Sequence, residues 1–205
     1  MNGDETKIIE SIKDIINPKF CLEISKDKVV KIILTEPDAS LKKVTIYGFD
    51  SEKTYAFKLD AKDELNIHKT IRISEYLNPN AEKDINRGCD GIIFTILNGV
   101  GYVLICEMKS EIPHKKDYIQ QFRNSSLFIK FISYILDEFY GINVDFQIRY
   151  ILFDKKKSYG RTETNRKIVP KKESYQDKEL YIYRIHHPNE NRSLDIKLLD
   201  ISTYC

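Results

Sequence analysis

Two carboxylates and one lysine stand at the ends of neighbouring apolar runs and could together perform metal-assisted chemistry. Asp90 precedes the run GIIFTIL, and Glu107 and Lys109 end the next run, which begins at Val100. Hard cations such as Mg²⁺ bind one or two carboxylates together with water and substrate phosphate, and a nearby lysine can hold a phosphate or a polarised water. These residue types indicate metal-assisted hydrolysis of a phosphodiester bond.

The turn between the two runs determines which residues face one another. Asn98-Gly99 predicts a β-hairpin, because a type I′ turn requires positive φ at both central residues. The register that follows places Asp90 directly opposite Glu107, and strand alternation puts Lys109 on the same face. Opposed like charges are destabilising unless a positive group lies between them. The hairpin therefore predicts a site for a divalent cation.

An acid two residues before a lysine is by itself weak evidence for a catalytic site, because 31% of the residues are charged and this spacing arises easily by chance. Five such triplets occur, at residues 5–7, 60–62, 107–109, 154–156 and 195–197. Only two of them end a convincing hairpin strand. The rival hairpin, between residues 43–49 and 53–60, would place Asp60 opposite Lys43, which is an ordinary surface pair. A charged hairpin rim is the alternative interpretation for Asp90 and Glu107.

The order of these residues resembles the PD-(D/E)XK nuclease superfamily, which has the restriction-endonuclease-like fold. The resemblance covers residues 85–153, and Cys89 stands where the family name has proline. It implies that Asp90, Glu107 and the backbone carbonyl of Met108 bind Mg²⁺ or Mn²⁺, and that Lys109 orients or activates the attacking water.

The resemblance also implies accessory residues. Many members have an upstream acid, for which Glu10 fits by order along the chain and Glu75 by nearness to the hairpin. Some branches have a glutamine on the following helix, and Gln120 or Gln121 could fill that position. The sequence does not decide between Glu10 and Glu75, or between Gln120 and Gln121.

The surrounding pattern predicts an α/β (α+β) fold with a central mixed β-sheet flanked by helices, a restriction-endonuclease-like core and extra N-terminal strands. Helices are expected at 5–16 and from about residue 118 to Gly141, the second burying a stripe of apolar and small residues. Both hairpin strands are apolar on both faces, which favours a central position with helices on each side. We expect one domain over 1–205, in which the strands of residues 20–60 either extend the central sheet or form an N-terminal β-meander appendage. The stripe comprises Phe122, Ser125, Phe128, Ile132, Ile135 and Phe139.

A basic segment follows the last strand of the predicted core. Between residues 155 and 172 it carries eight basic residues against one acid and lacks apolar periodicity, so residues 155–175 are expected to form a loop. Lysine and arginine supply sequence-independent affinity for nucleic-acid phosphates, although a solvated loop is the alternative. The basic residues are Lys155, Lys156, Lys157, Arg161, Arg166, Lys167, Lys171 and Lys172.

The composition excludes several other classes of protein. The chain has 205 residues and a net charge of only +2, and it contains no apolar run long enough to span a membrane. Its four cysteines show no metal-binding spacing, which argues against zinc. We expect a cytoplasmic protein without a membrane partner.

The expected function is a metal-dependent endonuclease that acts on nucleic acid, with DNA favoured over RNA by the resemblance, in prokaryotic antiviral defence or restriction. The alternatives are a nucleic-acid-binding module that does not cut and a subunit that depends on a partner in a defence or repair complex. A homodimer is common in the family, but the sequence shows no heptad repeat or exposed apolar helix that indicates one.

Overall fold

The computed structural model describes residues 2–25, 30–36, 41–59, 61–62, 70–71, 73–78, 80–155, 168–187, 193–198 and 201. The helices are α1 (Asn2–Ile15), η1 (Pro18–Phe20, a 3-10 turn) and α2 (Lys115–Tyr140). The strands are β1 (Ile24–Ser25), β2 (Lys31–Thr35), β3 (Lys43–Tyr47), β4 (Thr54–Phe57), β5 (Ala61–Lys62), β6 (Thr70–Ile71), β7 (Gly91–Leu97), β8 (Val100–Met108), β9 (Gln147–Lys155), β10 (Lys171–Tyr175), β11 (Lys178–His187) and β12 (Ser193–Lys197). The fold belongs to the α+β class, as the sequence predicted.

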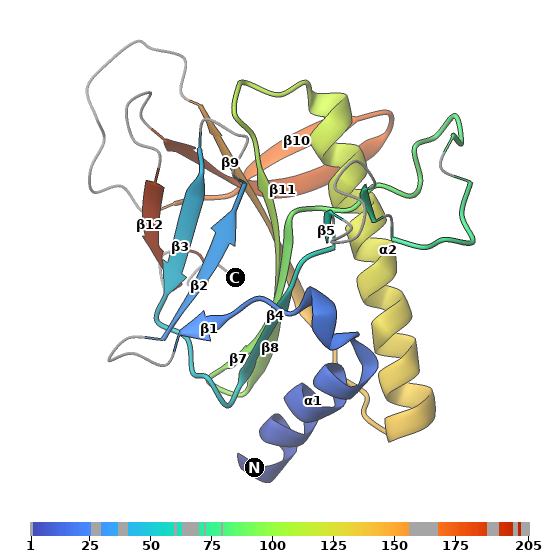
Figure 1. The fold of residues 1–205 in the computed structure, drawn as a ribbon, viewed down its shortest axis with the longest axis vertical. Helices are drawn as coiled ribbons and strands as arrows, with labels where there is room; N and C mark the ends of the chain where they lie inside the picture. The colour runs from blue at the N-terminus through green and yellow to red at the C-terminus, as the bar shows by residue number, and fades with distance from the viewer. Residues whose placement is uncertain are drawn as a thin grey trace.

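A six-stranded mixed sheet forms the centre of the molecule (Figure 1), in the order β10-β11-β9-β8-β7-β4. The three middle strands β8, β9 and β11 run parallel, and the outer strands pair antiparallel with them or with each other. The carboxyl ends of three adjacent parallel strands therefore meet at one edge of this sheet, together with the beginning of β7.

The β7–β8 hairpin has the predicted register. Leu97 pairs with Val100, and the pairing continues without a bulge to Gly91 opposite Cys106. The turn residues Asn98 and Gly99 have φ values of 51° and 80°, so both adopt the left-handed conformation that a type I′ turn requires. The next position along this register is Asp90 opposite Glu107.

Both long helices cover the same face of the sheet. Ile9 and Ile12 of α1 and Phe122 and Ile132 of α2 pack in one core with the even-numbered side chains of β7, such as Phe94. None of the helices in the described parts of the chain is long and apolar enough to cross a membrane.

A second sheet, in the order β1-β2-β3-β12, covers the opposite face. Its Ile32, Leu34 and Ile46 pack against Ile93 and Phe153 of the central sheet. The prediction of helices on each side was therefore wrong, because a strand that is apolar on both faces can be covered by a sheet as well as by a helix. The expected N-terminal strands exist, but β12 from the other end of the chain completes their sheet, and β4 belongs to the central sheet.

The rival hairpin between β3 and β4 does not form, because β3 pairs with β2 and β12 whereas β4 pairs with β7. Asp60 itself lies outside the described residues. The stretch 155–175 is also not a loop throughout. Lys155 ends β9, and Lys171 and Lys172 begin β10, which turns into β11 through Gln176-Asp177. The five basic residues between Lys155 and Lys171 lie outside the described part: Lys156, Lys157, Arg161, Arg166 and Lys167.

The buried face of α2 agrees with the prediction only over its first half. Phe122, Ser125 and Ile132 are buried, and Gly141 ends the helix in the left-handed conformation. Phe139, however, is 77% exposed, and Leu136 is buried in its place. A helix has 3.6 residues per turn, so a stripe extended mainly by steps of three drifts off the true buried face after a few turns.

Candidate functional site

The candidate site lies on the helix-covered face of the central sheet, where β8, β9 and β11 end and β7 begins. On β8, Val103 and Ile105 belong to the core beneath the helices, so Glu107 and Lys109 continue on that face. The Lys109 amide donates to the carbonyl of Phe153 at 2.8 Å, which continues the β8–β9 pairing and places Lys109 beside Asp154. The sheet edge thus positions the functional side chains in adjacent strands.

Asp90 and Glu107 meet at this edge as the hairpin register predicts. Glu107 is 1% exposed, and Asp90 is partly buried and accepts a hydrogen bond from the Met108 amide at 2.5 Å. Loss of hydration and the nearby charge of Glu107 raise the pKa of Asp90 well above its usual value, although the Met108 hydrogen bond and Lys109 oppose the shift. Two carboxylates in poor contact with water therefore share one small region.

Lys109 connects this acid pair to α2. Its Nζ forms an ion pair with Glu107 and donates to Oε1 of Gln121 at 2.9 Å. Gln121 is 2% exposed, and its Nε2 donates to the carbonyl of Gly88 at 2.9 Å. Both ends of the Gln121 amide are therefore fixed, and the lysine is held by two partners.

The neighbouring glutamine has a different environment. Gln120 donates to Asn124 at 2.9 Å and accepts from Arg123 at 3.4 Å, and both contacts lie within α2. Of the two glutamines that the sequence left open, Gln121 contacts the candidate site.

Neither upstream acid proposed from the sequence joins the carboxylate pair. Glu10 lies on the exposed side of α1 and pairs with Lys13 at 3.3 Å, and Glu75 is exposed in the connector before β7. A different acid, Glu36 at the end of β2, is close enough for its charge to raise the pKa of Asp90. No sequence signal predicts how β2 and β7 align, so the approach of Glu36 to Asp90 could not be inferred.

Close packing between the two sheets explains how Glu36 reaches this edge. A Cβ atom on Gly91 would lie 2.5 Å from Cδ2 of Leu34, so β2 passes directly over the first residue of β7. Glu36 follows Leu34 by two residues, which brings its charge within range of Asp90. Glycine at position 91 permits this approach.

The donor set fits a hard divalent cation. Asp90 and Glu107 supply carboxylate oxygens, which Mg²⁺ and Mn²⁺ prefer, and a positive ion between them would offset their mutual repulsion. Among the described residues, no group of three or more His, Cys, Asp or Glu side chains gathers as a metal cluster. A cation here would therefore keep positions for water and substrate oxygens.

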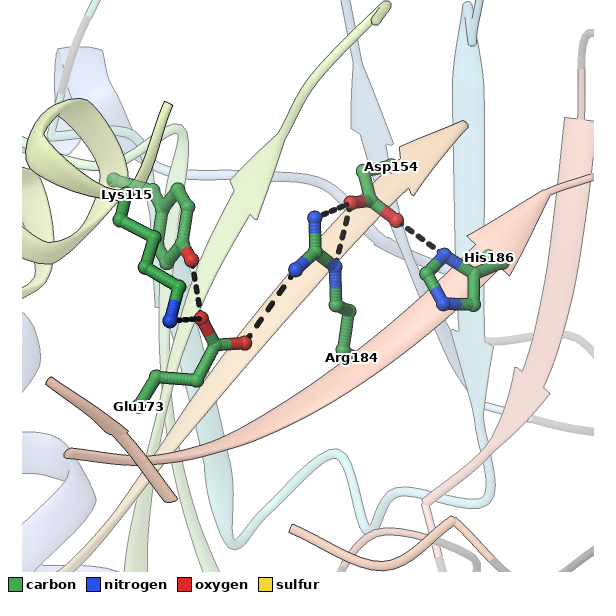
Figure 2. A network of polar contacts seen from close by, with 6 residues as sticks. Lys115, Asp154, Glu173, Arg184 and His186 are labelled. Carbon is green, nitrogen blue, oxygen red and sulfur yellow. Dashed lines mark hydrogen bonds and ion pairs between the residues drawn. The ribbon is translucent and has the colours of Figure 1, made fainter. Parts of the chain in front are cut away.

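A polar network beside the site joins side chains of β9, β10 and β11 (Figure 2). Asp154 is completely buried; its Oδ2 accepts from Nε and Nη2 of Arg184 at 2.7 and 2.5 Å, and its Oδ1 lies 2.6 Å from Nδ1 of His186. The other end of the Arg184 guanidinium lies 3.5 Å from Glu173. This network was not predicted from the sequence.

The network also holds the first turns of α2 against the sheet. The Tyr118 hydroxyl donates to Glu173, and Nζ of Lys115 lies 4.0 Å from the same carboxylate. Burial and this hydrogen bond raise the pKa of Tyr118, so the hydroxyl remains a donor. The alternation of β9, with Tyr150 and Leu152 on the helix face, is the sequence signal that could have identified Asp154 as a buried acid.

The basic segment is described only at its ends. Lys171 and Lys172 are exposed on β10, and Lys172 pairs with Glu179 at 2.8 Å. Lys155 ends β9 at the same sheet edge as Lys109. The chain thus enters the basic segment beside the candidate site.

Comparison of the chain with protein-family models, with curated proteins and with solved structures finds no match in any of the three.

Proposed function

We propose that this protein is a metal-dependent nuclease that hydrolyses phosphodiester bonds. The observation that carries the proposal is the meeting of Asp90, Glu107 and Lys109 at one sheet edge, with the lysine held by Gln121. Glu107 is buried and Asp90 and Lys109 are partly buried, and electrostatic interactions with a charged substrate are stronger in such a position than in bulk water. An ordinary surface pair would not need a buried glutamate or a buried glutamine beside its lysine.

Asp90 and Glu107 would hold Mg²⁺ or Mn²⁺, with the carbonyl of Met108 as a further ligand by the family resemblance. When bound, the ion would polarise a phosphoryl oxygen and lower the pKa of a water molecule. The Met108 amide keeps Asp90 oriented through its hydrogen bond at 2.5 Å. The two acids would therefore bind the ion, and the backbone fixes the orientation of Asp90.

Lys109 would orient the attacking water and stabilise the negative charge that develops on the phosphate. In the structure its ammonium group pairs with Glu107, and an ion bound between the acids would weaken that pairing. Gln121 would then be the positioning residue that keeps the lysine at the site.

Glu36 would influence the site through its charge, in place of Glu10 or Glu75, whereas the described acids do not gather as a group of three around one ion. Its charge acts on Asp90 from the end of the strand that packs over Gly91. A further negative charge near Asp90 would favour the binding of a cation there. The Glu36→Gln variant is expected to require a higher metal concentration for activity than the wild type.

The substrate is proposed to be nucleic acid, with DNA favoured over RNA by the resemblance and with antiviral defence as the biological role. The support from this chain is the basic segment that leaves the sheet at the site edge after Lys155 and returns at Lys171. Phosphate contacts from such a segment would fix the strand without reading its sequence.

The test is a cleavage assay of the purified protein with Mg²⁺ or Mn²⁺ on single- and double-stranded DNA and RNA. Glu107→Ala and Lys109→Ala are compared with Asp195→Asn and Lys197→Ala. The control pair has the same acid-x-lysine spacing on a strand, and both of its side chains are exposed on β12. The site variants should lose cleavage, and the controls should keep it.

Cleavage that survives both site substitutions would contradict the assignment of these residues. If no substrate is cut although nucleic acid binds, a binding module or a partner-dependent subunit would replace the nuclease proposal.

A further inference from the structure

Helix α2 presents an apolar surface that the fold leaves uncovered. In the described part of the chain, nine large hydrophobic side chains are exposed, and four of them lie on this helix. Leu127, Phe131 and Tyr134 are 65%, 58% and 73% exposed, respectively. They follow one another at intervals of four and three residues, so they form one continuous stripe along the helix.

Charged residues extend this stripe at both ends. Arg123 lies one turn before Leu127, and Glu138 lies one turn after Tyr134. Lys130 lies beside Phe131 on the same side of the helix. The α2 stripe, defined as Arg123, Leu127, Lys130, Phe131, Tyr134 and Glu138, thus has apolar side chains and one lysine in the middle, a basic residue at one end and an acidic residue at the other.

This distribution is complementary to itself when two copies of α2 cross antiparallel. With a twofold axis between residues 130 and 131, Leu127 faces Tyr134 of the second copy, and Arg123 faces Glu138. Lys130 then faces the ring of Phe131, an arrangement that suits a cation–π contact. Every contact occurs twice, which is the property of an isologous interface.

Hollows on both sides of the stripe provide space for the side chains of a second helix. One cavity of about 230 Å³ lies between α2, η1 and β4 and is lined by Phe128, Phe131 and Ile135. Another of about 340 Å³ lies between α2 and residues 143–148, next to Lys130 and Tyr134. Helices pack closely where the side chains of one fill the grooves of the other.

We infer that α2 is the interface of a homodimer, in which a second copy of this chain packs antiparallel on the α2 stripe. The central apolar residues bury each other, and the two Arg123–Glu138 pairs determine the direction and register of the helices. The inference is independent of the nuclease proposal, because none of the stripe residues belongs to the candidate site.

The first test measures the mass of the purified full-length chain in solution by sedimentation over a range of concentrations. The wild type is expected to be dimeric. Phe131→Glu should weaken self-association by about thirtyfold or more, because it introduces a charge at the centre of the interface. Phe139→Glu is the matched control, because Phe139 is also exposed on α2, at 77% against 58% for Phe131, but lies off the stripe.

The second test uses the charges to verify the register. Arg123→Glu and Glu138→Arg each place like charges opposite one another, so each should weaken the dimer by about tenfold or more. The double variant Arg123→Glu/Glu138→Arg restores both pairs and should dimerise again. An equal mixture of the two single variants should also form dimers, because the heterodimer has an opposite charge at both contacts.

A monomeric wild type at all concentrations would overturn the inference. A dimer that tolerates Phe131→Glu, or charge variants that fail to complement each other, would also overturn it. Circular dichroism of each variant separates loss of the dimer from loss of the fold.

Discussion

Asp154 is the buried charge on which the polar network beside the candidate site depends. Replacing it with alanine removes the partner of two Arg184 nitrogens and of the His186 ring in one step. Arg184 would retain only the longer contact with Glu173 at 3.5 Å. The perturbation therefore leaves a positive charge with poor compensation next to a completely buried position.

Removal of one partner from a buried ion pair costs about 3 to 5 kcal/mol. Arg184 is 22% exposed, so water can solvate part of its charge, and we expect the lower end of that range, about 3 kcal/mol. For a chain of this size each kcal/mol lowers the melting temperature by about 2 to 4 °C, so Asp154→Ala should melt about 6 to 12 °C lower than the wild type.

Thermal and urea unfolding followed by circular dichroism measure this loss. Lys172→Ala is the control, because it breaks an ion pair with Glu179 in which both side chains are about half exposed, and it should leave the melting temperature nearly unchanged. High salt should change the wild type little, since buried pairs are poorly screened. An Asp154→Ala protein that is as stable as the Lys172→Ala protein would refute the reasoning.

Three further predictions concern the candidate site. Burial and Glu107 raise the pKa of Asp90, so the folded state binds this proton more tightly than the unfolded state. Without divalent ions, stability should therefore fall as pH rises from the ordinary aspartate pKa of about 4 to the raised folded value. Asp90→Asn should abolish this decrease and should be more stable than the wild type at neutral pH. Thermal unfolding in EDTA measures both effects, and a variant less stable than the wild type would contradict the prediction. Gln121→Leu should lower kcat with little change in KM, because it removes the acceptor 2.9 Å from the Lys109 ammonium. Gln120→Leu should leave both constants unchanged. Equal effects of the two variants in a kinetic assay would argue against the positioning role of Gln121. Gly91→Ala should cost about 1 to 3 kcal/mol in chemical denaturation, because its Cβ would meet Leu34 at 2.5 Å, and Leu34→Ala in the same chain should recover part of the loss.

Local signals in the sequence were sufficient to predict the hairpin and the residues that it positions. Asn98-Gly99 set the register, and that register held through every pair down to Gly91 and Cys106. The strand of residues 147–155 and the glycine end of α2 were predictable for the same reason, since each depends on side chains within a few residues.

Features that depend on long-range pairing were not predictable. The second sheet requires β12 to pair with β3 from the other end of the chain, and no turn links these strands. The positions of Glu36 and Asp154 beside the site follow from how separate strands stack or align, and strand alternation alone does not encode that alignment.

Calorimetric titration of the protein with Mn²⁺ measures binding at the acid pair without requiring the substrate. The wild type should bind one or two ions, Glu107→Gln should lose binding, and Asp195→Asn should bind as the wild type does. Unchanged Mn²⁺ binding by Glu107→Gln, or no binding by the wild type, would contradict the claim that Asp90 and Glu107 form a metal site.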